Sequence, residues 1–293
     1  METVAFYSYK GGVGRSLLLA HAARFLAKLG KGVVALDFDF EAPGLHYKFG
    51  FDQISDPPTF TGGTVPYLIA TAEGAASPPR LIDQMLVPPR PVDIRGWVWL
   101  MPAGPAPHKI YWAALKQLGE RLRLGDPSGQ GLMALLDLRA RIADELKPDY
   151  LLIDARTGVT ELGSLATTML ADTVVCMFAV NQESFDGTLK VVEALECAPR
   201  LASQKPIRVV LAPSRNSVTD IVVSEVAANI LRESGHNDLQ LFVLPHDNLP
   251  ASETLSAFLA ALQGLPKAFR GTLSHRYRLR PKFFRTFHPP PAL

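Results

Sequence analysis

The sequence predicts an α/β protein built on a doubly wound, mostly parallel sheet, and three observations support this. Apolar runs of strand length alternate with amphipathic runs of helix length along most of the chain. The first forty residues fit a strand–helix–strand unit, which brings its two strands parallel. Of the 293 residues, 47% are hydrophobic, so the chain can bury a large core.

The strand–helix–strand unit begins the chain. Residues Thr3–Tyr9 and Gly32–Asp39 are apolar and predict two buried strands. Between them, Arg15–Leu29 is predicted to be a helix, and Gly30 is suited to end it in a left-handed conformation. The apolar face of that helix repeats at helical spacing: Leu18, Ala22, Phe25, Leu26 and Leu29.

Residues 51–108 break the alternation. The segment holds the proline pairs 57–58, 78–79 and 88–89, and it predicts loops and short helices around one strand at Trp97–Met101. Helices are then expected at Tyr111–Leu124 and Leu132–Leu146, and the α/β alternation resumes. Strands are expected at Asp149–Asp154, Thr173–Val180, Ile207–Ala212 and Gln240–Leu244, and helices at Glu161–Leu170, Ser184–Glu196, Val218–Glu233 and Glu253–Leu262.

The sequence predicts one domain at residues 1–265, with a proline-rich insertion at about 51–108. A basic, aromatic tail is predicted at 266–293. The whole chain carries a net charge of +2. Seven cations and no acidic residue follow Glu253, so the chain up to Glu253 carries a net charge of −5. A tail that mixes cations with Tyr277, Phe283, Phe284 and Phe287 suits nucleic acid, an anionic lipid surface or an acidic partner. Packing of the tail on its own acidic body or on a dimer mate is the alternative.

Composition narrows the class of protein. No apolar run reaches the ~20 residues of a membrane-spanning helix, and the chain opens on a strand pattern without a signal-peptide pattern, so a cytoplasmic protein is expected. Cys176 and Cys197 are too far apart for a CxxC metal pair, and we expect two reduced, buried thiols. His46, His108, His236 and His246 show no metal-binding spacing and are expected on the surface or in loops.

A glycine-rich stretch, FYSYKGGVGRS, joins the first strand to the first helix. Glycines at 11, 12 and 14 allow successive backbone N–H groups to turn inward toward a phosphate, and the following helix adds the positive end of its dipole. Ser16 stands where such loops place the hydroxyl that contacts Mg²⁺. A glycine-rich turn without a ligand is the alternative.

The stretch departs from the common GxxxxGK[ST] pattern, because Tyr9 and Arg15 replace a glycine and the lysine. It resembles the deviant phosphate loop of the ParA/MinD family, xKGGxGK[ST]. The resemblance implies a SIMIBI-like P-loop NTPase fold and an ATP-dependent homodimer, with Lys10 reaching the partner subunit's phosphates. Arg15 is then expected to contact phosphate within its own subunit. The expected nucleotide-binding residues of the loop are Gly11, Gly12, Val13, Gly14, Arg15, Ser16 and Leu17.

Two strands that follow end in acidic residues. The stretch DFDFEAPGL begins with a family-like Asp-x-Asp at the end of the second strand, which implies that Asp37 supports the Mg²⁺ region and Asp39 orients the hydrolytic water. Ordinary turn or capping residues are the alternative. In PDYLLIDARTG, the resemblance implies that Asp154 holds Mg²⁺ and that the Gly158 amide senses the γ-phosphate. The expected metal set is Ser16, Asp37, Asp39 and Asp154, and the expected catalytic set is Lys10, Asp39 and Arg15.

Arg156 departs from the family pattern, and phosphate binding, partner binding and a plain surface position remain open. The sequence shows no guanine-specific NKxD signal. By resemblance, Arg215, Pro245 and Asp247 are candidates for contact with adenine, with ordinary loop residues as the alternative.

The expected function is a cytoplasmic, bacterial, Mg²⁺-dependent ATPase of ParA/MinD type, whose homodimer regulates or positions an unidentified partner protein. A hydrolysis-poor, ATP-bound scaffold in a multi-protein system, such as bacterial defence, is the first alternative. A DNA-binding partition ATPase that uses the basic tail is the second.

Overall fold

A computed structural model describes residues 1–51, 60–72, 78–88, 94–105, 109–122, 130–158, 164, 166–179, 181–198, 205–214 and 240–241. The basic tail and the helices expected at Val218–Glu233 and Glu253–Leu262 lie outside these residues. In the described part, none of the helices has the length and apolar character needed to cross a membrane.

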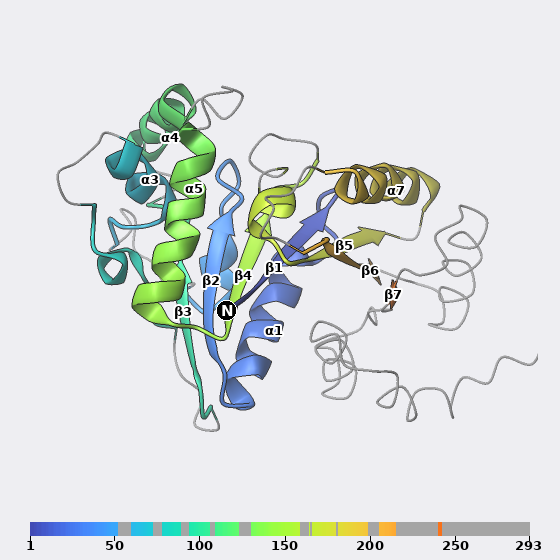
Figure 1. Cartoon of the computed structure of the whole chain (residues 1–293), viewed down its shortest axis with the longest axis horizontal. Helices are drawn as coiled ribbons and strands as arrows, with labels where there is room; N and C mark the ends of the chain where they lie inside the picture. The colour runs from blue at the N-terminus through green and yellow to red at the C-terminus, as the bar shows by residue number, and fades with distance from the viewer. Residues whose placement is uncertain are drawn as a thin grey trace, which may run out of the picture.

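The core of the fold is a seven-stranded sheet in which every neighbouring pair is parallel, in the order β3-β2-β4-β1-β5-β6-β7. The doubly wound α/β prediction is confirmed. Figure 1 shows β1 and β4 in the middle of the sheet. The strands are β1 (Glu2–Ser8), β2 (Gly32–Phe38), β3 (Trp97–Met101), β4 (Tyr150–Ala155), β5 (Thr173–Ala179), β6 (Arg208–Ser214) and β7 (Gln240–Leu241).

The central strands β1, β2 and β4 are buried along almost their whole length, because helices cover both sides of the sheet. Along β1, Val4 and Phe6 pack with α1 on one face, whereas Ala5 and Tyr7 belong to the cluster on the other face. Helices α1 (Arg15–Lys28) and α2 (Leu45–Lys48) cover the first face. The second face is covered by α3 (Thr64–Ala72), α4 (Lys109–Leu122), α5 (Gln130–Arg141) and α7 (Gln182–Glu196).

Most predicted boundaries differ from the observed ones by one or two residues. Gly30 adopts φ 85°, so the left-handed end of α1 is confirmed. The helix expected at Leu132–Leu146 is instead α5 followed by a π-helical turn at Ile142–Leu146, and a second π-helical turn lies at Ala166–Leu170. A 3₁₀ turn at Leu81–Gln84 precedes β3.

Two expectations of burial are wrong. Cys176 is buried in β5, but Cys197 follows the last turn of α7 and is exposed. His46 is a buried residue of α2 and not a surface residue, because the chain after β2 folds back and encloses the ring beside Tyr47 and Phe60. Burial lowers the pKa of His46. Sequence spacing did not reveal this enclosure, since α2 has only four residues.

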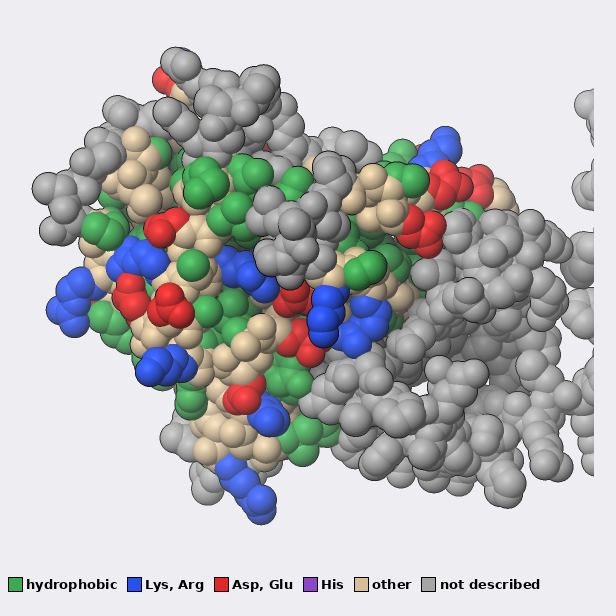
Figure 2. Space-filling model, in the orientation of Figure 1, with side chains coloured by type: hydrophobic (Ala, Val, Ile, Leu, Met, Phe, Trp, Pro, Cys, Tyr) green, Lys and Arg blue, Asp and Glu red, His purple; other side chains and the backbone are tan. Residues whose placement is uncertain are grey.

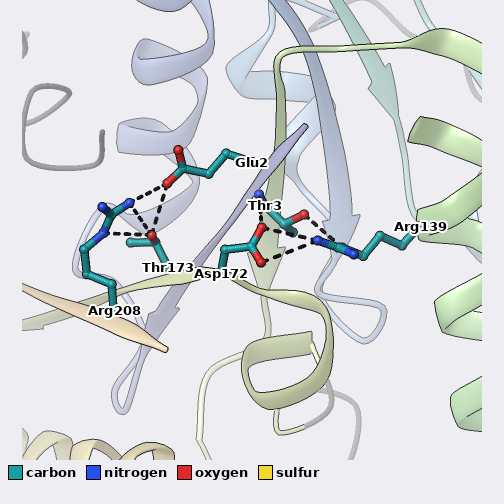
Figure 3. A network of polar contacts seen from close by, with 6 residues as sticks. All are labelled: Glu2, Thr3, Arg139, Asp172, Thr173 and Arg208. Atoms are coloured by element: carbon teal, nitrogen blue, oxygen red, sulfur yellow. Dashed lines mark hydrogen bonds and ion pairs between the residues drawn. The ribbon is translucent and has the colours of Figure 1, made fainter. Parts of the chain in front are cut away.

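Two clusters of polar contacts join elements at the amino ends of the central strands (Figure 3). In one, Arg139 of α5 donates to Thr3 Oγ1 at 3.1 Å and pairs with Asp172 at 3.3 Å. In the other, Arg208 of β6 pairs with Glu2 and donates to Thr173 Oγ1 at 2.7 Å. These contacts fix the strands and α5 at the amino ends of the strands, opposite the carboxyl ends.

On the face in Figure 2, acidic and basic side chains are interspersed, with no large patch of one sign among the described residues.

Candidate phosphate-binding site

The glycine-rich loop lies at the carboxyl end of β1 and leads directly into α1. Gly12 and Gly14 adopt φ 76° and 86°, a left-handed conformation that disfavours side chains. Gly14 caps α1, and its carbonyl accepts a hydrogen bond from Leu18 N at 2.9 Å. The loop glycines are exposed, and a Cβ on Gly11 or Gly14 would meet nothing within 4 Å. The loop therefore presents accessible backbone at a helix N-terminus, which suits an anion.

Two contacts that the sequence did not predict support this loop. Ser214, at the end of β6, donates its hydroxyl to Val13 O at 2.7 Å, and the Val13 side chain is buried beneath the loop. On the other side, the ring of Tyr9 lies against Gly187 of α7, where an added Cβ would overlap the ring carbons. Tyr9 stands at the position of the first glycine of the GxxxxGK[ST] pattern. The absence of a side chain at Gly187 leaves room for its ring.

Gly187→Ala is expected to lower the free energy of unfolding by about 1–3 kcal/mol, because the new methyl group overlaps the Tyr9 ring. Urea denaturation measures the change. Gly119→Ala is the matched control, since Gly119 is also helical and its Cβ would meet nothing within 4 Å. Equal stabilities of the two variants would contradict the proposed packing of Tyr9.

Arg15, the first residue of α1, points to the acidic strand ends. Its Nε donates to Asp154 Oδ1 at 2.5 Å, and its Nη2 donates to Asp39 Oδ2 at 2.7 Å. Its Nη1 lies 3.4 Å from Ser8 Oγ, at the end of β1. The side chain of Arg15 is 7% exposed. One guanidinium thus joins two carboxylates from the ends of β2 and β4.

Burial dominates the electrostatics of the two innermost carboxylates. It raises the pKa of Asp154, although Arg15 and a hydrogen bond from Ser16 act in the opposite direction. Asp37 lies beside Asp154 in the register of β2 and β4. Burial, reinforced by the neighbouring Asp154, raises the pKa of Asp37 to about 8. Arg15 therefore balances negative charge in a part of the fold that disfavours it.

Asp37 shapes the loop that follows β2. One oxygen accepts from Asp39 N at 3.1 Å, and the other accepts from Gly44 N and Leu45 N at 3.2 and 3.1 Å. The carboxylate thereby caps α2 and closes the loop on itself. Asp37 therefore makes contacts of the capping kind, and its expected role toward Mg²⁺ stays a prediction.

The two loops that carry acidic residues are joined at their tips. Arg156, which follows β4, forms an ion pair with Glu41, which follows β2. Farther along the β4 loop, Gly158 adopts φ 75°, and its N–H donates to Ser8 O at 3.3 Å. The structure thus shows Arg156 as the partner of another loop residue, a role that the sequence did not suggest.

Lys10 is held by α7. Its Nζ lies 2.7 Å from Glu183 Oε1 and over the Tyr9 ring at 5.7 Å from the centroid. The hydrogen bond that Lys10 donates to Glu183 raises the pKa of the lysine. The side chain remains 47% exposed, so it is accessible from outside the subunit.

The structure therefore gathers most of the predicted site at one edge of the sheet. The glycine loop and Ser16 follow β1, Asp37 and Asp154 lie near the carboxyl ends of β2 and β4, and Asp39 and Gly158 follow these two strands. Leu17 is 49% exposed on the first turn of α1. The adenine candidates Arg215, Pro245 and Asp247 lie outside the described residues. Three residues that contact the loop were not found from the sequence: Glu183, Gly187 and Ser214. They belong to no recognisable motif, and only the fold brings them to the loop.

The residues of the site fit a phosphate group, and their oxygen atoms are of the type that binds a magnesium ion. Exposed backbone at Gly11–Gly14 and the N-terminus of α1 suit phosphate, and the oxygens of Ser16, Asp39 and Asp154 are the ligands that Mg²⁺ prefers. Among the described side chains, however, no group of three or more His, Cys, Asp or Glu is arranged to hold a metal. Arg15 already occupies one oxygen of each of two candidate ligands.

Comparison with protein families identifies a match over residues 4–257 to the CobQ/CobB/MinD/ParA nucleotide-binding domain. Comparison with curated proteins finds no match.

Solved structures with a similar fold carry nucleotides. The septum site-determining protein MinD from Pyrococcus horikoshii, complexed with Mg-ADP, is 18% identical, with a TM-score of 0.60 over 90% of this chain and 98% of that one. Cobyrinic acid a,c-diamide synthase from Mycobacterium smegmatis, with a bound ATP analogue and magnesium, is 15% identical, with a TM-score of 0.61 over 91% and 98%. A variant of McdA from Cyanothece, in complex with ATP, is 17% identical, with a TM-score of 0.56 over 96% and 99%.

Proposed function

Because the chain belongs to the CobQ/CobB/MinD/ParA family of nucleotide-binding domains, we propose that it is an ATP-binding and ATP-hydrolysing switch. Two copies would enclose nucleotide as a homodimer and regulate or position a partner protein. The observation that carries the proposal is the open glycine loop at the head of α1, beside carboxylates from the ends of β2 and β4. Ligands of parallel α/β sheets bind at this edge.

The residues have distinct proposed roles. Amides of the loop bind the phosphates, and Arg15 adds a cation. Asp39 orients the attacking water, and Lys10 is exposed enough to reach the phosphates of the partner subunit. Mg²⁺, when bound, neutralises charge that develops on the phosphates. Ser16, Asp39 and Asp154 would hold it, Asp154 through water.

Calorimetric titration with ATP, ADP and AMP in Mg²⁺ tests nucleotide binding. ATP and ADP are expected to bind, and AMP is expected to fail because it lacks the phosphates that the loop holds. Gly14→Ala should weaken ATP binding, because φ 86° disfavours a side chain there. Gly119→Ala, also in open space but within α4, should leave it unchanged. No heat with any nucleotide would reject the proposal.

A hydrolysis-poor, ATP-bound scaffold is the second candidate, and one contact favours it. The guanidinium of Arg15 lies 2.7 Å from the carboxylate of Asp39, the group that would orient water. If that contact persists with nucleotide bound, turnover is suppressed.

Phosphate release by the unmodified protein and by Arg15→Lys separates the two candidates. The scaffold predicts negligible release by the unmodified protein and faster release by Arg15→Lys, whose single ammonium cannot join both carboxylates. The switch predicts release by the unmodified protein that Asp39→Ala abolishes. Strong turnover by the unmodified protein rejects the scaffold.

A further inference from the structure

The carboxylates that face the phosphate loop already have a cation. We infer that Arg15 is the resident counter-ion of Asp39 and Asp154, and that it excludes a divalent metal from them until a bound phosphate draws its guanidinium away. The inference deepens the proposed function, on which it rests, by assigning an order of events at that site. The phosphate group binds first, and the metal gains its ligands afterwards.

The geometry of the guanidinium supports a dedicated contact. Three of its nitrogens are directed at oxygens from three different strand ends: Nε to Asp154, Nη2 to Asp39 and Nη1 toward Ser8. The exposed fractions of the Arg15 and Asp154 side chains are 7% and 1%, so water screens their interaction little. This is not a surface ion pair that forms and breaks freely.

Competition follows from the position of the charge. A metal at Asp39 and Asp154 would lie beside a buried positive charge, because Arg15 uses one oxygen of each carboxylate. Two cations sharing these ligands repel each other in a poorly screened environment. Metal binding therefore requires that the guanidinium leave.

The phosphate loop offers the guanidinium its alternative partner. Arg15 directly follows the glycine loop and opens α1, and planar guanidinium groups bind phosphate with two parallel hydrogen bonds. A phosphate in the loop thus competes with the two carboxylates for the same side chain. Departure of Arg15 would free both carboxylates at once and couple the two binding events.

The exclusion of metal by Arg15 can be tested without turnover, by titrating the nucleotide-free protein with Mn²⁺ and following free Mn²⁺ by electron paramagnetic resonance. The unmodified protein is expected to show no specific Mn²⁺ binding. Arg15→Gln should bind at least ten-fold more tightly, because its neutral amide leaves the carboxylates to the metal. Arg15→Lys should lie between, since one ammonium can pair with only one carboxylate at a time. Arg24→Gln, on the same helix but over the Phe49 ring, is the control and should match the unmodified protein.

Thermal denaturation gives a second reading in the same samples. Mn²⁺ should raise the melting temperature of Arg15→Gln and leave that of the unmodified protein unchanged, because a ligand stabilises only a fold that binds it. If Arg15→Gln does not fold, the comparison rests on Arg15→Lys. Specific Mn²⁺ binding by the unmodified protein as tight as that of the variants would overturn the inference. Absence of binding in every variant would also overturn it.

Failure of the proposed function has a different signature. In that case no nucleotide gives heat in calorimetry, whereas the Mn²⁺ ranking of the Arg15 variants still holds. Conversely, nucleotide binding with equal Mn²⁺ affinities across the Arg15 series retains the function and removes the role of Arg15 as counter-ion.

Discussion

Arg15→Ala is expected to lower the free energy of unfolding of the nucleotide-free protein by about 3–5 kcal/mol. The substitution removes the cation between Asp39 and Asp154 and leaves two carboxylates facing each other in a poorly hydrated part of the fold. The loss is large because a buried carboxylate without a partner has lost its hydration and receives nothing in exchange. Urea denaturation in buffer without metal or nucleotide measures the change.

The control for this prediction is a more exposed ion pair of the site. Arg156→Ala removes the partner of Glu41, but these two side chains are 33% and 52% exposed. Water solvates the remaining charge, so the loss should stay below about 1 kcal/mol. Equal losses for Arg15→Ala and Arg156→Ala would contradict the description of Arg15 as a buried counter-ion.

Lys10→Ala is expected to abolish ATP-dependent dimerisation, with little effect on the stability of the monomer. The exposed ammonium of Lys10 makes a surface ion pair with Glu183 and lies over the Tyr9 ring, and such exposed contacts contribute little to folding. Its proposed partner is a phosphate bound by the other subunit. Light scattering of the protein with ATP and Mg²⁺, against the same protein without nucleotide, gives the measurement.

Glu183→Gln tests whether the contact of Lys10 with Glu183 competes with its proposed contact with the partner subunit's phosphate. It removes the carboxylate that holds Nζ at 2.7 Å and keeps the size of the side chain. If the contact with Glu183 competes with the partner's phosphate, dimers should form at lower ATP concentration than with the unmodified protein. A dimer that persists in Lys10→Ala would remove the proposed role of the lysine.

The arrangement of the sheet was predictable because its signals are local. Strands buried on both faces must be apolar throughout, and the amphipathic runs between them have helical spacing, as in α1. Glycines at 12 and 14 have left-handed φ values that few other residues tolerate. A short sequence window therefore suffices to place the loop, the strand ends and the aspartates that follow them.

The contacts within the site were not predictable, because they depend on distances between remote segments. Arg15 and Asp154 are 139 residues apart, and Ser214 and Val13 are 201 residues apart. The sequence placed the cation Arg15 next to the glycines. It did not indicate whether that side chain contacts a ligand or the carboxylates of Asp39 and Asp154. Burial of His46 was missed for the same reason, since it depends on how the chain after β2 folds back.

The ion pair between Glu41 and Arg156 is a contact between the segment after β2 and the segment after β4. Because both side chains are partly exposed, water competes for the pair and the contact is weak. A charged group on another protein would therefore need to break little to take the place of either side chain.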